Sequence, residues 1–293
     1  MRVAVYDLGS NSTRLLVADV AEDRRITELE RRSTVTRLGQ GVDTTGRLDE
    51  QAMARVLAAL DDYAAVTARA GAQVAVGVLT SAVRDADNGA SFAAAVRDRY
   101  GIAARTIPGA EEARLTYLGA ISERDDREPT AVIDIGGGST EVVVGQRGAL
   151  RFHVSTQVGV VRHTERHLPA DPPAAAHVAA LRADAAATFR CEVPPGLGVR
   201  SAVAVAGTAT QTAAMLGSST LGRDALEGLL ERLAGLPLAE REQVPGLDPA
   251  RAPTIVAGLA ILLEVMAALA VENVEASDHD ILRGAALEHT AFE

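Results

Sequence analysis

Two segments of the chain repeat one pattern of apolar and polar positions. Each has an apolar run that ends in an aspartate, then a short turn of small polar residues, and then a second apolar run. Residues 3–17 align with residues 130–144 without gaps, so Asp7 corresponds to Asp134 at a constant offset of 127. Apolar, β-rich runs joined by a turn that admits glycine predict a β-hairpin. Because the hairpin occurs twice, we expect two similar halves.

The apolar spacing after each hairpin predicts alternating strands and helices, which is typical of the α/β class. In the first half we expect strands at 26–32, 73–80 and 103–107 and helices at 50–70, 90–100 and 110–122. In the second half we expect strands at 150–155, 201–205 and 273–277 and helices at 173–189, 208–216, 224–234, 253–271 and 280–289.

The likeness of the two halves also predicts two domains. The segment between them, residues 122–129, is rich in charge and ends in a proline, as linkers commonly are. We therefore expect one domain at residues 1–123 and a second at residues 124–293.

The basic residues limit the chemistry that the chain can perform. All 29 are arginines, so reactions that need an amine, such as Schiff-base formation or phosphate binding by a P-loop lysine, are excluded. With 39 acidic residues the formal charge is −10, which argues against broad nucleic-acid binding. A phosphorylated substrate would therefore need binding groups that act locally.

Two further features indicate a cytoplasmic protein without a membrane segment. The chain runs directly into a strand pattern without a charged leader and apolar signal core, and Glu264 interrupts the most apolar stretch, residues 254–271. Cys191 is the only cysteine, which rules out an internal disulfide and a cysteine metal cluster.

The hairpin turns carry the residues expected to bind an anion. Turns of glycine and small hydroxyl residues leave backbone N–H groups free to point at phosphate oxygens. We expect Asn11, Ser12 and Thr13 to do so in the first turn, with Asn11 able to adopt a positive φ. In the second turn and in a third, strand-to-helix turn, the expected contacts are Gly136, Gly137, Gly138, Ser139, Thr140, Gly207 and Thr208.

Acidic residues next to these turns are candidates for metal and proton chemistry. Asp7 and Asp134 offer hard oxygen ligands for Mg²⁺, and Glu141 begins the outgoing strand of the second hairpin, where it can join Asp134. Glu111 and Glu112 lie near a helix start, about 100° apart around its axis, so at most one faces a site and can activate water.

Basic side chains near the turns offer candidate phosphate ligands. Arg162 and Arg166, four residues apart on one helical face, form a possible track for further phosphates, although a solvated face is the better interpretation for Arg166. Arg84 follows the end of a strand, where ligand sites of α/β sheets gather. The histidines receive no metal or catalytic role, because His163 and His167, four residues apart, lack an adjacent acidic ligand in the sequence.

At these residues the sequence resembles the exopolyphosphatase/guanosine pentaphosphate phosphatase (Ppx/GppA) family of the actin/Hsp70/sugar-kinase superfamily. It is similar to the short form, without the C-terminal HD-like domain of longer members. The resemblance covers nearly the whole chain and includes, beyond the two hairpin turns, residues 38–48, 82–86, 111–115, 159–166, 205–208, 249–252 and 276–284.

The resemblance implies two ribonuclease-H-like domains with an active site in the cleft between them. It also implies a hydrolase that removes terminal phosphates from inorganic polyphosphate with Mg²⁺, or with Mn²⁺ in its place. Glu112 matches the family's water-activating glutamate, Asp134 and Glu141 match its second-turn acids, and Arg84 matches an arginine that lines the substrate path.

The resemblance leaves the substrate and the assembly open. Short polyphosphate chains are the expected substrate, and the alternative is the 5′-phosphate of guanosine pentaphosphate (pppGpp), with ppGpp as a further ligand and a homodimer as one assembly. A phosphotransferase of the same superfamily and a noncatalytic sensor of these anions are rival interpretations; the first lacks a recognisable adenosine-pocket motif, and the intact acids argue against the second.

Overall fold

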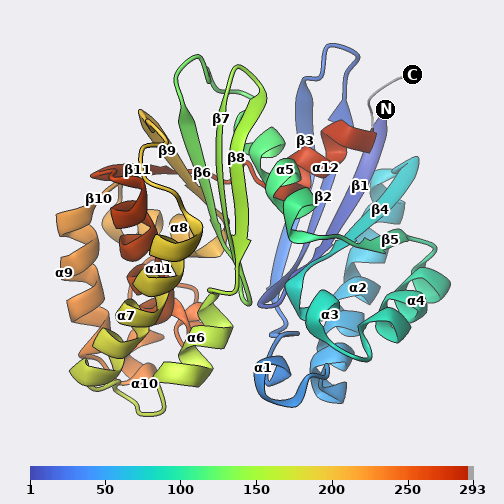
Figure 1. The fold of residues 1–293 in the computed structure, drawn as a ribbon. Coiled ribbons are helices and arrows are strands. Elements are labelled where there is room, and N and C mark those ends of the chain that lie inside the picture. Colours follow the sequence, from blue (N-terminus) through green and yellow to red (C-terminus); the bar gives the residue numbers. More distant parts are fainter. Residues whose placement is uncertain (290–293) are drawn as a thin grey trace. The chain divides into compact units, whose positions relative to one another are not determined.

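The first hairpin lies in the middle of a five-stranded mixed sheet. The computed structural model describes residues 1–289, and Figure 1 shows the arrangement of their elements. The strand order is β3-β2-β1-β4-β5, in which β2 is antiparallel to both of its neighbours and β1, β4 and β5 are parallel. The strands are β1 (Arg2–Leu8), β2 (Ser12–Val20), β3 (Ile26–Val35), β4 (Val74–Leu79) and β5 (Ala103–Thr106).

Helices cover both faces of this sheet, because successive residues of its central strands are buried on opposite sides. Ala4, Tyr6 and Leu8 contribute to a core that also contains residues of α2 and α4, whereas Val3 and Val5 share a second core with α12. The helices of this unit are α1 (Val42–Thr45), α2 (Glu50–Ala70), α3 (Ser81–Asp85), α4 (Gly89–Tyr100), α5 (Gly109–Ala120) and α12 (Ile281–His289).

The second hairpin lies in a six-stranded sheet with the same central topology. Its order is β10-β11-β9-β6-β7-β8, so β8, β7, β6, β9 and β11 correspond to β3, β2, β1, β4 and β5 of the first sheet. This shared order confirms the predicted α/β class and the expected likeness of the two halves. The strands are β6 (Thr130–Ile135), β7 (Thr140–Gln146), β8 (Ala149–Thr156), β9 (Ser201–Val205), β10 (Thr220–Gly222) and β11 (Asn273–Ala276).

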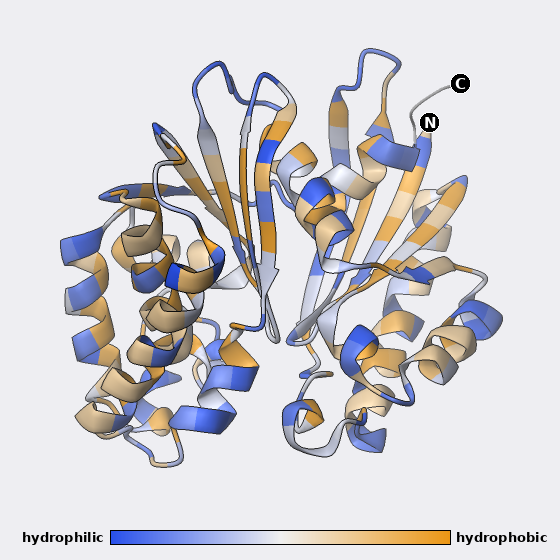
Figure 2. Ribbon diagram, in the orientation of Figure 1, coloured by the Kyte–Doolittle hydropathy of each residue, from blue (hydrophilic) through white to orange (hydrophobic). Residues whose placement is uncertain are grey.

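The core of the second unit forms around one apolar helix, α11, of which twelve residues are buried. Figure 2 shows hydrophobic residues along the strands and hydrophilic residues in the turn between β2 and β3. Over the described residues, no helix is both long and apolar enough to span a membrane. The helices are α6 (Val160–His167), α7 (Ala175–Glu192), α8 (Ala206–Leu216), α9 (Arg223–Ala234), α10 (Leu238–Arg241), the 3₁₀ turn η1 (Pro249–Arg251) and α11 (Ile255–Leu269).

The last helix corrects the expected division of the chain. Residues 1–122 form one unit together with the segment that starts at His279, whereas residues 123–278 form the other. We expected α12 in the second domain, but it packs on α5 of the first unit. The two helices approach closely because both carry glycine at the contact: a Cβ on Gly284 would lie 1.8 Å from the Leu115 carbonyl oxygen, and one on Gly119 would lie 1.9 Å from that of Asp280.

This close contact makes Gly284 a sensitive position. We expect Gly284→Ala to lower the free energy of unfolding by about 1–3 kcal/mol, because the added methyl group has to displace backbone. The matched control is Gly228→Ala in α9, where a Cβ meets nothing within 4 Å. That change should stabilise the protein by about 1 kcal/mol through helix propensity. Urea unfolding measures both, and equal effects of the two substitutions would contradict the packing described here.

Candidate active site

Asp7 stands at the end of β1, where it is buried and paired with an arginine. The antiparallel register places Arg14 of β2 directly opposite, and its Nε donates to Asp7 Oδ2 at 2.8 Å. The Arg14 Nη1 also donates to the carboxylate of Asp280, which precedes α12. Burial raises the pKa of Asp7, and Arg14 opposes that rise. The second oxygen of Asp7, Oδ1, is buried without a hydrogen-bond partner.

The turn after Asp7 is held by backbone and hydroxyl contacts. The Gly9 N–H donates to the Ser12 carbonyl at 3.0 Å, and the Ser10 hydroxyl meets that of Ser81 at 2.8 Å. Asn11 and Ser12 are buried, and Asn11 Oδ1 has no partner. The Thr13 hydroxyl lies 3.0 Å from that of Thr36 and is fully buried, so it serves the packing of the unit.

Asn11 does not adopt the positive φ that the sequence analysis considered for it. A left-handed backbone occurs instead at Arg37, whose φ is 51°. Arg37 belongs to the segment that covers the turn, because the Thr36 and Arg37 N–H groups both donate to the Asn11 carbonyl, at 3.0 and 2.9 Å.

Glu112 and Arg84 form a pair at the same edge of the first sheet. Parallel β1, β4 and β5 end side by side there, and α3 and α5 follow β4 and β5. Arg84 Nη1 donates to Glu112 Oε2 and to the Ile107 carbonyl, both at 3.1 Å. Glu112 is buried, as a group that faces a site would be.

The neighbouring Glu111 faces the other way. Arg114, one helical turn along α5, donates to it at 2.8 Å and holds its pKa below the ordinary value. The structure therefore separates the two adjacent glutamates, as the helix geometry predicted, and it is Glu112 that meets Arg84.

Asp134 and Glu141 come together in the second unit. They are direct partners in the antiparallel pairing of β6 and β7, which places their side chains on the same face of the sheet. Both are buried, and Ser155 of β8 donates its hydroxyl to Glu141 Oε1 at 2.7 Å. The hairpins therefore differ at the position opposite the aspartate, which is arginine in the first and glutamate in the second.

The glycine turn after Asp134 is anchored by its carbonyl groups. The Gly136 carbonyl accepts from Val160 N–H at 2.9 Å, that of Gly137 from Val161 N–H at 2.8 Å, and that of Gly138 from Arg162 Nε at 2.9 Å. Because C=O and N–H of one peptide plane point in opposite directions, the N–H groups that follow these three carbonyls point away from α6. Such a row of amides is suited to bind an anion.

The residues beside the glycine turn explain its fit to α6. A Cβ on Gly159 would lie 2.4 Å from the Gly137 carbonyl oxygen, so only glycine permits this approach. The Thr140 hydroxyl donates to the Val158 carbonyl at 2.6 Å and is fully buried, which gives it a structural role. Ser139 is also buried.

The third turn joins the same edge of the second sheet. Asp134 of β6 pairs in register with Val205, the last residue of β9, and α8 begins immediately afterwards. Ala206 has a φ of 63°, a conformation that costs free energy for a residue with a Cβ. A Cβ added at Gly207 would lie 1.8 Å from Nη1 of Arg251, so the guanidinium lies directly against this glycine. The Thr208 side chain packs against Gly258 of α11.

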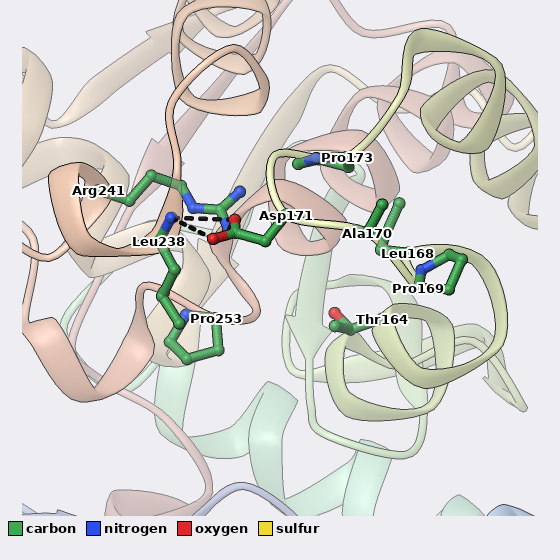
Figure 3. A pocket seen from close by; sticks show the side chains of 9 residues that line it. All are labelled: Thr164, Leu168, Pro169, Ala170, Asp171, Pro173, Leu238, Arg241 and Pro253. Carbon is green, nitrogen blue, oxygen red and sulfur yellow. Dashed lines mark hydrogen bonds and ion pairs between the residues drawn. The ribbon is translucent and has the colours of Figure 1, made fainter.

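A cavity of about 170 Å³ lies elsewhere in the second unit. Its wall includes Thr164 and Arg241, and Figure 3 shows Asp171 directed at Arg241. Asp171 Oδ1 accepts from Arg241 Nη2 at 2.8 Å, and the Leu238 N–H also donates to this carboxylate. None of the residues predicted to form the site lines this cavity.

One expectation about the histidines is wrong. His163 and His167 of α6 do have an acidic neighbour, Asp184 of α7, and the three side chains could hold a metal ion. Burial lowers the pKa of His163 to about 4, so its imidazole is neutral at neutral pH. These residues are distinct from the acids at the sheet edges.

Comparison with known proteins identifies the family. The model of the Ppx/GppA phosphatase family matches residues 16–289. The chain belongs to this family. It is 37% identical to exopolyphosphatase 2 of Mycobacterium tuberculosis, over 98% of each chain. Its structure is similar to that of an exopolyphosphatase-like protein, with a TM-score of 0.91 and 30% identity over 99% of this chain and 98% of the other. It is also similar to that of a Ppx/GppA family member from Aquifex aeolicus, with a TM-score of 0.81 and 26% identity over 99% of this chain and 97% of the other.

Three arginines support the turns of this family member in roles that the sequence analysis did not predict. Arg14 balances Asp7, Arg162 holds the glycine turn, and Arg251 covers Gly207. The alignment of the two hairpins could have pointed to Arg14, because Arg14 stands where the second hairpin has Glu141. Arg162 and Arg251 lay within matched motifs, but their partners are distant in the sequence.

Proposed function

We propose that this chain is an exopolyphosphatase, which hydrolyses the terminal phosphoanhydride of inorganic polyphosphate and releases orthophosphate. Support comes from the name of its relative in Mycobacterium tuberculosis. The observation that carries the proposal is the acidic pair Asp134–Glu141 beside a glycine turn whose amides point away from α6. Together they offer ligands for a cation and donors for an anion, which hydrolysis of a phosphoanhydride requires.

The terminal phosphate would be bound mainly by backbone groups. The N–H groups of Gly137, Gly138 and Ser139 would donate to its oxygens, and the start of α8 at Gly207 and Thr208 would add the positive end of a helix dipole. In the first unit, Asn11 and Ser12 are the candidates, since the side chains of Thr13 and Thr140 are committed to packing.

The residues fit a divalent cation of the magnesium class. Asp134 and Glu141 are buried, adjacent acids, and hard carboxylate oxygens are the ligands that Mg²⁺ and Mn²⁺ prefer. Asp7 offers the unpartnered Oδ1, but Arg14 already balances its charge, so the second hairpin is the better fit. When bound, the ion would neutralise charge on the terminal phosphate.

Glu112 would remove a proton from the attacking water. It is buried, and Arg84 fixes one of its oxygens at 3.1 Å, which holds the carboxylate in one orientation. Arg84 is partly exposed, and we infer that it also meets the substrate. No covalent intermediate is needed, so the absence of lysine does not limit this reaction.

We expect Glu112→Gln to fold and to bind polyphosphate but to lose about 100-fold or more in kcat, because the amide cannot accept the proton. The matched control is Glu111→Gln, which removes the adjacent carboxylate that pairs with Arg114 and should retain most of the activity. Phosphate release measures both. An unimpaired rate in Glu112→Gln would remove this residue from the mechanism.

We expect Glu141→Gln to raise the Mg²⁺ concentration needed for half-maximal activity about tenfold or more, because one anionic ligand becomes neutral. Glu275→Gln is the control, since Glu275 pairs with Arg124. A magnesium titration of phosphate release distinguishes the two, and an unchanged magnesium requirement in Glu141→Gln would argue against this metal assignment.

Polyphosphate should be hydrolysed faster than the 5′-phosphate of pppGpp. We further expect short chains to be preferred, because a net charge of −10 repels a long polyanion, and salt should enhance activity on long chains by screening that repulsion. Phosphate release from the two substrates, side by side and at two salt concentrations, measures this. Faster turnover of pppGpp would instead support the alternative substrate.

A further inference from the structure

Two histidines and an aspartate converge in the second unit, away from the acids assigned to catalysis. His163 and His167 are four residues apart in α6, so they lie on one face of the helix, with ring centroids 5.6 Å apart. Asp184 of α7 faces both: its Oδ2 lies 2.9 Å from His167 Nε2 and 3.5 Å from His163 Nε2. One ligand atom from each residue lies within 4.8 Å of the other two.

The buried nitrogen of His163 is the observation that points to a ligand. The side chain is 1% exposed, and its Nε2 has no hydrogen-bond partner even though it is directed toward Asp184. Buried polar atoms in folded proteins are almost always satisfied, so an orphaned imidazole nitrogen beside a carboxylate needs an explanation.

The donor set selects the class of metal. Imidazole nitrogens favour zinc and its transition-metal neighbours, whereas magnesium prefers an all-oxygen shell. In a tetrahedral zinc site with bonds of about 2.0–2.1 Å, ligand atoms are about 3.3 Å apart. The 3.5 Å between His163 and Asp184 is close to that spacing, and the 2.9 Å between His167 and Asp184 needs to open slightly.

We propose that His163, His167 and Asp184 form a second metal site, which binds one zinc-class divalent ion and leaves a coordination position for water. Binding at Nε2 requires the ring proton of His163 on Nδ1. Nδ1 now accepts from Gly159 N–H in a weak bond of 3.3 Å. Metal binding would break this bond and form a coordination bond at Nε2 instead.

The position of the site gives it a consequence for the glycine turn. The first residues of α6 donate to the carbonyls of Gly136 and Gly137, and His163 lies one turn further along the same helix. An ion shared by α6 and α7 would therefore fix the helix that anchors the turn. The metal ligands themselves include none of the residues assigned to the proposed hydrolysis, so metal binding can be tested separately from that reaction.

Zinc titration of the purified, chelator-treated full chain tests the proposal. We expect one Zn²⁺ to bind per chain, Co²⁺ to give the visible absorption of a tetrahedral site, and excess Mg²⁺ not to displace either ion. His167→Gln and Asp184→Asn should each weaken zinc binding at least tenfold. Both side chains are partly exposed, at 21% and 41%, so these variants are suited to retain the fold.

The control is His153→Gln, which removes an exposed histidine on β8 and should bind zinc as the unmodified chain does. Thermal unfolding gives a second readout, because an ion that binds only the folded state raises the midpoint of the unmodified chain and the control but not of the two site variants. Absence of zinc binding, equal affinity in all variants, or loss of binding in Glu141→Gln would each overturn the proposal.

Discussion

The register of the two central hairpins is the constraint on which the rest of the site depends. Antiparallel pairing fixes which residues stand opposite each other, and a slip of one position would turn every side chain to the other face. In the second unit this register sets Asp134 opposite Glu141, and in the first it sets Asp7 opposite Arg14. The same backbone therefore sets two acids, the proposed cation ligands, opposite each other in one unit and forms an internal ion pair in the other.

Local geometry also makes the proposed anion binding compatible with an acidic chain. The net charge of −10 acts over a distance that salt limits to about 8–10 Å, whereas backbone amides act at contact. The first N–H groups of α6 have no acceptors within the helix, and the glycine carbonyls of the turn accept from them. This arrangement gives the turn after Asp134 its outward-facing donors. Satisfying the helix start thereby orients the opposite side of the turn.

The sequence predicted most of the elements, though not α6, and pointed to the hairpin acids, because these follow from local periodicity and from an internal repeat. It could not assign α12 to the first unit, since the contact between Gly284 and Leu115 joins residues far apart in the chain. For the same reason it did not find Asp184 beside His163. The roles of Arg162 and Arg251 depend likewise on tertiary contacts, which spacing along the chain does not reveal.

The place of α12 also determines the order in which the molecule can be completed. A ribosome releases the strands of the first unit early, but the helix that packs against Val3 and Val5 emerges only after the whole second unit. Until then one face of that sheet lacks part of its cover, whereas residues 123–278 are contiguous and can fold as soon as they are made. The second unit can therefore mature first, and the first unit is completed only when α12 follows it.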